Sequence, residues 1–221
     1  MTHDHHATDF GPATTSVEFW ESHYAALDTA WGTEPNPVLV DTLGALAPAP
    51  ERALDLGAGH GGDALWLAAR GWRVTAVDVS NTALQRVSAA AEQAGLDDLV
   101  TVERHDLTET FPEGRFDLVT ACYFHTPLEV DRYAMLRRGA GRLDEGGLLV
   151  VVEHASVAPW SWKGDHGHAT FPTPEESLAA LALSPQQWRT ERCAAPQRAA
   201  SGPSGQTAVV TENVIVLRRR P

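Results

Sequence analysis

The chain has 221 residues, a length that suits one domain with a single sizeable core. Its 29 acidic residues outnumber its 17 basic ones, and the resulting formal net charge of −12 disfavours a nucleic-acid partner because phosphate backbones would be repelled. The two cysteines make no disulfide framework, the N-terminus has no signal-peptide pattern, and no apolar run approaches the roughly 20 residues that span a bilayer. We therefore expect a cytoplasmic protein with a small-molecule partner, and neither a nucleic acid nor a membrane as partner.

Residues 1–15 are predicted to be a flexible tail, and residues 16–221 a single domain. The tail carries three histidines that could hold a metal loosely, but a polar tail without fixed structure is the simpler interpretation. A helical pattern follows over 17–27, where Trp20 and Tyr24 stand four residues apart and share a face. After a turn-rich segment, a second helical pattern covers 38–46 and ends before two prolines.

From residue 52 onward, apolar runs of strand type alternate with helical patterns. The predicted strands are 52–56, 73–78, 100–104, 116–122 and 148–153, and the predicted helices between them are 60–70, 81–94 and 128–140. Strands that alternate with helices of this length predict an α/β fold with a doubly wound parallel sheet, covered by helices on both faces.

The last part of the chain begins with a long segment, 155–173, that has no periodic pattern and contains several prolines and glycines. A loop of that length inside a domain is usually functional or disordered, so we expect a lid or an insertion loop. A capping box with proline at the first helical position predicts a helix from Pro174. Two closing strands are predicted over 188–193 and 207–217, joined by a hairpin-type connection over 198–206.

The most informative motif is the glycine-rich turn that follows the first predicted strand. Glycines at 57, 59, 61 and 62 allow a tight bend and a close approach of a ligand to the backbone. The second strand ends at Asp78, whose carboxylate is a natural acceptor for the two hydroxyl groups of a ribose. Together the turn and Asp78 predict a nucleoside-bearing cofactor.

The glycine spacing alone leaves two cofactors open. A dinucleotide site uses G-x-G-x-x-G, and this turn satisfies G-x-G but blurs the rest, so an NAD-dependent oxidoreductase stays an alternative. The residues after the next two strands narrow the choice, because His105, Asp106 and Leu107 follow the third strand and 115–119 opens the fourth after a short connection.

In their order and spacing, these motifs resemble the class I S-adenosylmethionine-dependent methyltransferases over roughly residues 17–217. The family's first strand and glycine turn match 55–61, its acidic residue at the end of the second strand matches Asp78, and its adenine-contacting acidic residue matches Asp106. The resemblance implies a Rossmann-like, seven-stranded, mostly parallel sheet with an antiparallel edge hairpin at its C-terminal end, and S-adenosylmethionine as cofactor.

Two further segments, 31–37 and 64–72, look like those of small bacterial methyltransferases of the tellurite-resistance and thiopurine type. The resemblance also implies roles for individual residues. Asp55 and the glycine turn would hold the methionine end, Asp78 the ribose, and Asp106 the adenine amino group. The full set expected to bind the cofactor is Tyr24, Trp31, Asp55, Gly57, Ala58, Gly59, Gly61, Asp78, Val79, Asp106, Leu107 and Cys122.

Aromatic residues near the N-terminus have two interpretations. Trp20, Tyr24 and Trp31 could cover the cofactor, because the face of an electron-rich ring attracts a sulfonium cation. Plain packing of an N-terminal helix explains them equally well.

S-adenosylmethionine already carries its electrophile, so the protein mainly aligns a nucleophile with the methyl group, and a base is needed only if the acceptor must lose a proton. His125, after the fourth strand, is the first candidate for that base and His154, after the fifth, is the second. For each, the alternative is a wall histidine that is hydrogen-bonded to the backbone. Segment 121–127 lacks the motif of nucleic-acid amino-methylating enzymes, which further disfavours a nucleic-acid acceptor.

The residues expected to contact the acceptor are Tyr123, Trp160, Trp162 and His166, the last three of them in the 155–173 loop. Asp165, His166 and His168 lack a firm metal-ligand spacing, so no metal is predicted. The expected function is methyl transfer by direct displacement to oxygen, nitrogen, sulfur or a heavier chalcogen of a small molecule. The alternatives are a non-catalytic protein that binds the cofactor and the NAD-dependent oxidoreductase.

Overall fold

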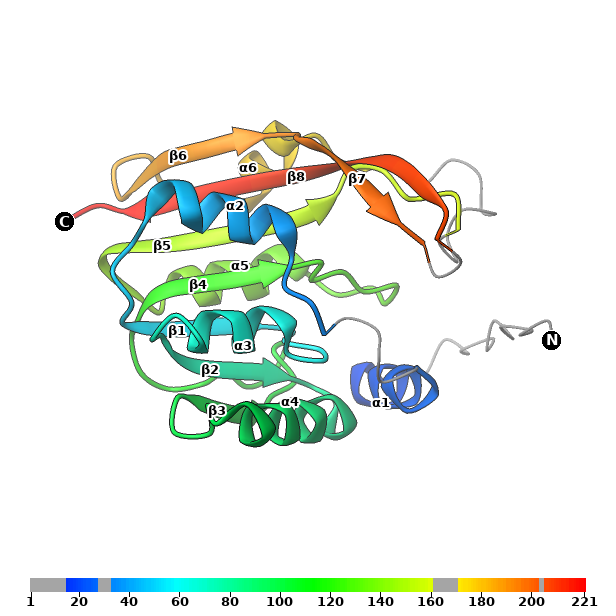
Figure 1. The fold of residues 1–221 in the computed structure, drawn as a ribbon. Coiled ribbons are helices and arrows are strands. Elements are labelled where there is room, and N and C mark those ends of the chain that lie inside the picture. Colours follow the sequence, from blue (N-terminus) through cyan, green and yellow to red (C-terminus); the bar gives the residue numbers. More distant parts are fainter. Residues whose placement is uncertain (1–14, 28–32, 161–170, 203–204) are drawn as a thin grey trace.

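A computed structural model describes residues 15–27, 33–160, 171–202 and 205–221. Most of the predicted tail, and also Trp31, Trp162 and His166, lie outside these residues. The described chain forms one mixed sheet flanked by helices, with the carboxyl ends of its parallel strands at one edge (Figure 1).

The sheet has the strand order β3-β2-β1-β4-β5-β8-β6, with β7 paired to β8. β1 to β5 are parallel to one another, whereas β8 runs antiparallel to both β5 and β6. The strands are β1 Arg52–Leu56, β2 Arg73–Asp78, β3 Val100–Arg104, β4 Phe116–Cys122, β5 Leu143–His154, β6 Trp188–Ala194, β7 Gln197–Ser201 and β8 Thr207–Arg219. The predicted α/β, Rossmann-like fold is confirmed.

The helices divide between the two faces of the sheet. They are α1 Ser16–Ala26, α2 Pro37–Leu46, α3 Gly62–Ala68, α4 Asn81–Ala94, α5 Arg132–Ala140 and α6 Pro174–Leu181. α2, α3 and α4 cover one face and α5 and α6 the other, while α1 lies at the edge formed by the carboxyl ends of the strands (Figure 1). Among the described residues, no helix is both long and apolar enough to cross a membrane.

The central strands are buried on both faces, which explains their nearly continuous apolar runs. From Leu54 to Leu56 every side chain of β1 is buried, including the carboxylate of Asp55. One apolar cluster packs between the sheet and α5 with α6, and a second packs between the sheet and α2, α3 and α4. Because the strands are held from both sides, the turns at their carboxyl ends are firmly placed.

Three elements differ most from the prediction. β7 occupies part of the segment predicted as a connection, so the sheet has eight strands rather than seven. α5 begins at Arg132 rather than at 128, because Asp131 caps it by accepting a hydrogen bond from the amide of Ala134 at 2.9 Å. β5 begins five residues earlier than predicted, at Leu143, and the bend at Gly146 lies within it.

Candidate functional site

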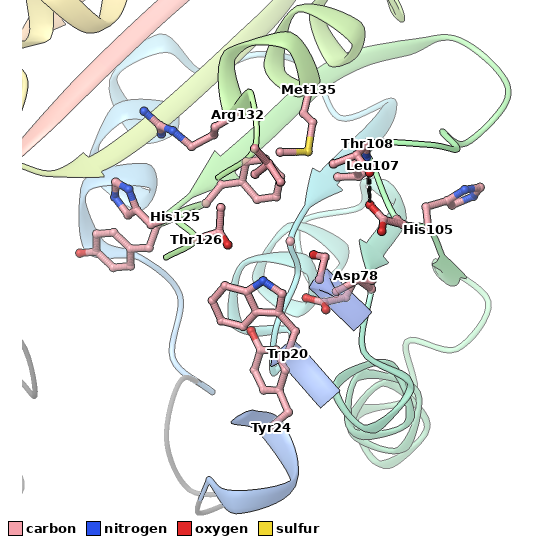
Figure 2. Close-up of a pocket in the computed structure, with 17 residues that line it drawn as sticks. Trp20, Tyr24, Asp78, His105, Leu107, Thr108, His125, Thr126, Arg132 and Met135 are labelled. Carbon is pink, nitrogen blue, oxygen red and sulfur yellow. Dashed lines mark hydrogen bonds between the residues drawn. The ribbon is translucent and has the colours of Figure 1, made fainter. Parts of the chain in front are cut away.

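A cleft opens at the carboxyl ends of β1, β2 and β4, between α1 and the first turn of α5 (Figure 2). It holds about 620 Å³ of empty space, part of which is open to solvent. Parallel α/β sheets commonly bind ligands at this edge, where the strand order changes direction beside β1 and β4. The cleft is therefore the candidate functional site.

Asp78 ends β2 at the floor of the cleft and is only 5% exposed. Its Oδ2 accepts a hydrogen bond from the amide of Gly59 at 3.0 Å, and its Oδ1 accepts one from the amide of Ser80 at 2.9 Å. Burial raises the pKa of this carboxyl group, and the amides of Ser80 and Gly59 oppose that rise. Since each carboxylate oxygen has two lone pairs, each can accept another hydrogen bond from a ligand hydroxyl.

The glycine turn passes beside Asp78 in a left-handed conformation. Gly57 has φ +70° and Gly59 has φ +54°. A Cβ on Gly57 would lie 2.7 Å from Cδ2 of Phe124, and one on Gly59 would lie 2.9 Å from the hydroxyl oxygen of Tyr24. Both positions therefore require glycine, for the backbone angle and for the close approach of an aromatic side chain. Gly61 also has a positive φ, of +86°, and it makes room for Val87 of α4, so it too requires glycine.

Asp55 lies beneath the glycine turn in a group of buried acidic side chains. Its Oδ1 accepts a hydrogen bond from Thr120 at 2.7 Å, while its Oδ2 is buried and has no hydrogen-bond partner among the described residues. Burial and the nearby Asp63 raise the pKa of Asp55 to about 7. Cys122 shares this group, where burial and both carboxylates raise the pKa of its thiol. A cationic or hydrogen-donating ligand group would satisfy the open oxygen of Asp55.

The segment after β3 lines the far end of the cleft. Asp106 accepts hydrogen bonds through Oδ1 from the amide of Thr108 at 3.1 Å and from its hydroxyl at 2.7 Å. Leu107 beside it is buried and faces the cleft. Asp106 and Leu107 thus place a carboxylate next to an apolar surface, and this pair suits a planar nucleobase that carries an amino group.

The tip of β4 turns sharply into the cleft at Tyr123, which has φ +52°. A left-handed φ is uncommon for a residue with a side chain and costs energy, so other contacts must hold it. The Tyr123 hydroxyl donates to Glu212 and accepts from Nη2 of Arg198 at 3.0 Å. Its ring stacks on His154, with 4.0 Å between ring centroids.

His125 lines the cleft just beyond this turn. Its Nε2 accepts a hydrogen bond from the backbone amide of His154 at 3.2 Å. A neutral His125 therefore carries its proton on Nδ1 and acts there as a donor. The ring of His154 stacks against both Tyr123 and His125, so it supports the wall of the cleft.

The remaining wall is mostly apolar. Phe124, Val130 and Met135 line it. Arg132 contributes to the same wall, but its guanidinium forms an ion pair at 2.6 Å with the buried Glu153 of β5. This half of the cleft offers apolar and aromatic contact surface.

Most predicted site residues meet at this cleft. Those that line it are Tyr24, Gly57, Asp78, Val79, Asp106, Leu107, Tyr123 and His125. Asp55, Ala58, Gly59, Gly61 and Cys122 lie in or beneath the glycine turn. Trp160 lies away from them, against the β7–β8 turn, where a Cβ on Gly202 would be 2.8 Å from its ring.

Sequence reasoning missed several residues of the wall. Phe124 adjoins a predicted residue, but nothing in the sequence indicates that its ring lies on Gly57. Arg132 and Met135 are three residues apart on α5, so a helical-face argument could have found them. Within the described parts of the chain, no group of three or more side chains is placed to hold a metal ion.

Known proteins provide an independent comparison. A family model described as a methyltransferase domain matches residues 53–147. The chain is 32% identical over 139 residues to the 27-O-demethylrifamycin SV methyltransferase of Amycolatopsis mediterranei (strain S699), a match that covers 60% of this chain and 48% of that protein. These matches support a methyltransferase domain of the class I S-adenosylmethionine-dependent type, with residues 53–147 as its matched part. It spans about half the length or less of the curated relatives it matches.

Solved structures of methyltransferases and related proteins share the fold. One is a structure from work on the conversion of a disulfide bond into a thioacetal group during echinomycin biosynthesis. It has a TM-score of 0.71 and 22% identity to this chain, and the match covers 93% of both chains. Magnesium protoporphyrin IX methyltransferase (ChlM) from Synechocystis PCC 6803 with bound SAM has a TM-score of 0.66 and 15% identity, covering 95% of this chain and 99% of that one. At these identities the likeness concerns the fold alone.

The cofactor of this methyltransferase family fits the residues of the cleft. Asp78 is a buried carboxylate with acceptor capacity left for ribose hydroxyls, and Gly57 and Gly59 leave the backbone accessible. The open, buried Oδ2 of Asp55 suits the positively charged amino group of a methionine moiety. When bound, S-adenosylmethionine supplies an electrophilic methyl group on a sulfonium centre.

Proposed function

We propose that this methyltransferase transfers the methyl group of S-adenosylmethionine by direct displacement to a small molecule bound in the apolar half of the cleft. The observation that supports the proposal is that a polar half and an apolar half adjoin each other in one cleft. Asp78 and the glycine turn form the polar half, and Phe124, Val130 and Met135 line the apolar half. A cofactor in the first half and an acceptor in the second would lie in contact at the tip of β4.

In this proposal the cofactor half is organised by Asp55, Asp78 and Asp106, which take the amino group, the ribose and the adenine respectively. Trp20 and Tyr24 of α1 supply ring faces beside it, which favour a sulfonium cation. These three roles are assigned because the side chains are carboxylates that still have lone pairs available to accept hydrogen bonds from a ligand.

The acceptor half favours a ligand with apolar or aromatic surface. The charge of Arg132 is balanced by Glu153 through Nη2, while its buried Nη1 has no hydrogen-bond partner among the described residues and could donate to a polar group of the acceptor. The curated relative is named as a methyltransferase of 27-O-demethylrifamycin SV, which supports an oxygen of a small molecule as the methylated atom. The net charge of −12 continues to disfavour nucleic acids.

His125 stays a candidate for contact with the acceptor. Because its Nε2 accepts a backbone amide, we propose that a neutral His125 donates from Nδ1 and orients the acceptor atom. Acceptors that ionise near neutral pH, such as thiols and acidic phenols, would then need no base from the protein. The base role remains a prediction that the His125 variants below test.

We also propose a cytoplasmic location, which the two free cysteines support, since oxidising compartments favour disulfides. The narrower resemblance to tellurite-resistance and thiopurine-type enzymes stays a prediction.

The proposal is tested in two steps. Calorimetric titration with S-adenosylhomocysteine, and separately with NAD, first establishes the cofactor. A panel of thiols, phenols and aliphatic alcohols is then incubated with S-adenosylmethionine, and methylated product is measured by mass spectrometry against the Asp78→Ala variant. Micromolar binding of S-adenosylhomocysteine with product from one acceptor class supports the proposal. Binding without product across the panel favours a non-catalytic cofactor-binding protein, and NAD binding alone overturns the assignment.

A further inference from the structure

Helix α1 lies across the cofactor half of the cleft, although it is remote from that half in sequence. Ser16, Trp20 and Tyr24 are spaced four residues apart, so they share one face of α1, and all three line the cleft (Figure 2). The Tyr24 hydroxyl approaches Gly59 so closely that no side chain fits between them. The position of α1 therefore decides how open the cofactor half is.

Apolar contact alone attaches α1 weakly. Of its own residues only Phe19 is buried, and its main packing partner is α4. A helix of 11 residues with so little buried surface needs a further attachment to hold a fixed position.

Glu21 provides that attachment at the N-terminus of α4. Its carboxylate accepts a hydrogen bond from the Ser80 hydroxyl at 2.7 Å, one from the Thr82 hydroxyl, and one from the Thr82 amide at 3.3 Å. The first amides of a helix have no partner within the helix and lie at the positive end of its dipole, so an anion is favoured there. Glu21 is thus a charged cap for α4 that is supplied by another helix.

The same short segment also reaches the cofactor half. The Ser80 amide donates to Asp78, while the Ser80 hydroxyl donates to Glu21. Helix α1, which carries Trp20 and Tyr24, is therefore hydrogen-bonded to Ser80, two residues after Asp78.

We propose that Glu21 is a positioning residue, which holds α1 against the cofactor half of the cleft and so slows the exchange of cofactor and product. The inference rests on the proposed use of S-adenosylmethionine. Glu21 acts through α1, because Glu21 itself does not line the cleft within the described chain. The cofactor leaves when the bonds from Glu21 to α4 break and Tyr24 moves off the glycine turn.

The test measures release of S-adenosylhomocysteine directly. Tritium-labelled S-adenosylhomocysteine is bound to the full chain, chased with excess unlabelled compound, and followed by rapid filtration. We expect Glu21→Ala to raise the dissociation rate about tenfold, because charge-assisted hydrogen bonds are lost. Glu21→Gln, which keeps a neutral acceptor, should have a smaller effect.

Glu18→Gln is the matched control. Glu18 lies on the same helix and loses the same charge, but its hydrogen bonds stay within the capping box of α1 at Thr15. Its dissociation rate should stay within about twofold of the parent. Thr82→Val removes one partner of Glu21, so adding it to Glu21→Ala should have little further effect.

Amide hydrogen exchange and urea unfolding separate positioning from general stability. We expect faster exchange over residues 16–26 in Glu21→Ala, with only a small fall in the urea midpoint, because Ser80 still caps α4 by accepting from the amide of Ala83. An unchanged dissociation rate, or a raised rate that only follows a lower urea midpoint, overturns the role of Glu21 and leaves the proposed function intact. If the parent chain does not bind S-adenosylhomocysteine, the proposed function fails and this inference fails with it.

Discussion

The ring of Phe124 lies directly on the backbone of Gly57, where a single added methyl group would come within 2.7 Å of it. This contact joins the tip of β4 to the glycine turn after β1. The two segments to which the proposed function assigns the cofactor and the acceptor are thus in contact with each other.

Gly57→Ala should break this contact. Alanine at φ +70° is strained, and its Cβ would push Phe124 away. We expect the affinity for S-adenosylhomocysteine to fall at least about tenfold and the free energy of unfolding to fall by about 1–2 kcal/mol. Calorimetry and urea unfolding measure the two effects.

Gly95→Ala is the control, because Gly95 has φ +67° at the end of α4 and open space around the added Cβ. It should lose similar stability without any loss of affinity. If both variants bind alike, the contact with Phe124 has no part in the cofactor site.

Asp78→Ala should abolish measurable binding of S-adenosylhomocysteine while the fold is kept. The carboxylate is the buried acceptor at the end of β2, and its loss also frees the amides of Gly59 and Ser80. Calorimetry gives the affinity, and circular dichroism checks that helices and strands remain. Unchanged affinity would show that the ribose assignment is wrong.

His125 variants distinguish a hydrogen-bond donor from a base. We expect His125→Ala to lower turnover on oxygen or nitrogen acceptors about tenfold while leaving affinity for S-adenosylhomocysteine nearly unchanged. His125→Gln should recover most of the loss, because an amide can donate but cannot take a proton. A pH–rate profile for each variant completes the test. Failure of glutamine to rescue would favour the base, and equal activity of all three would make His125 a wall residue.

The pair Asp55 and Asp63 should make the ligand-free protein less stable as pH rises. Burial raises the pKa of both carboxyl groups, that of Asp55 from 3.8 to about 7, so the folded state binds protons that the unfolded state has released. Between about pH 4 and pH 7 the contribution of this pair to stability therefore falls with rising pH. We expect Asp55→Asn to raise the melting temperature at pH 8 and to change it little at pH 5. The parent and the variant share every other titrating group, so a difference that is the same at both pH values would contradict the assignment.

Much of the fold could be predicted because its elements end at local signals. The predicted bounds of β1 to β4 and of α4 match the structure, where Ser80 caps α4 and Gly95 ends it at positive φ. β7 was not predicted, since Gln197–Ser201 has little apolar pattern and becomes a strand by pairing with β8. The strand β7 therefore depends on β8, its pairing partner on the other side of the connecting turn.

The candidate site likewise contains residues that could be predicted from sequence and residues that could not. Asp78 and Asp106 could be placed from sequence because one ends a strand and the other follows one, and the carboxyl ends of these strands meet at one edge. The left-handed backbone of Tyr123 could not, since it depends on Glu212 and Arg198 from β8 and β7. Glu21 could not be placed either, because its partners Ser80 and Thr82 lie about 60 residues further along the chain.

The antiparallel strand β8 has a consequence for the order in which the sheet assembles. β8 lies between β5 and β6, so β6 precedes it in the chain but cannot join the sheet until β8 is in place. Pairings between residues that are so far apart in sequence form late, because long loops must close first. During synthesis β5 would wait as an exposed edge for a strand that leaves the ribosome more than 50 residues later. Removing 207–219 should therefore leave a chain with two unpaired strands and a strong tendency to aggregate.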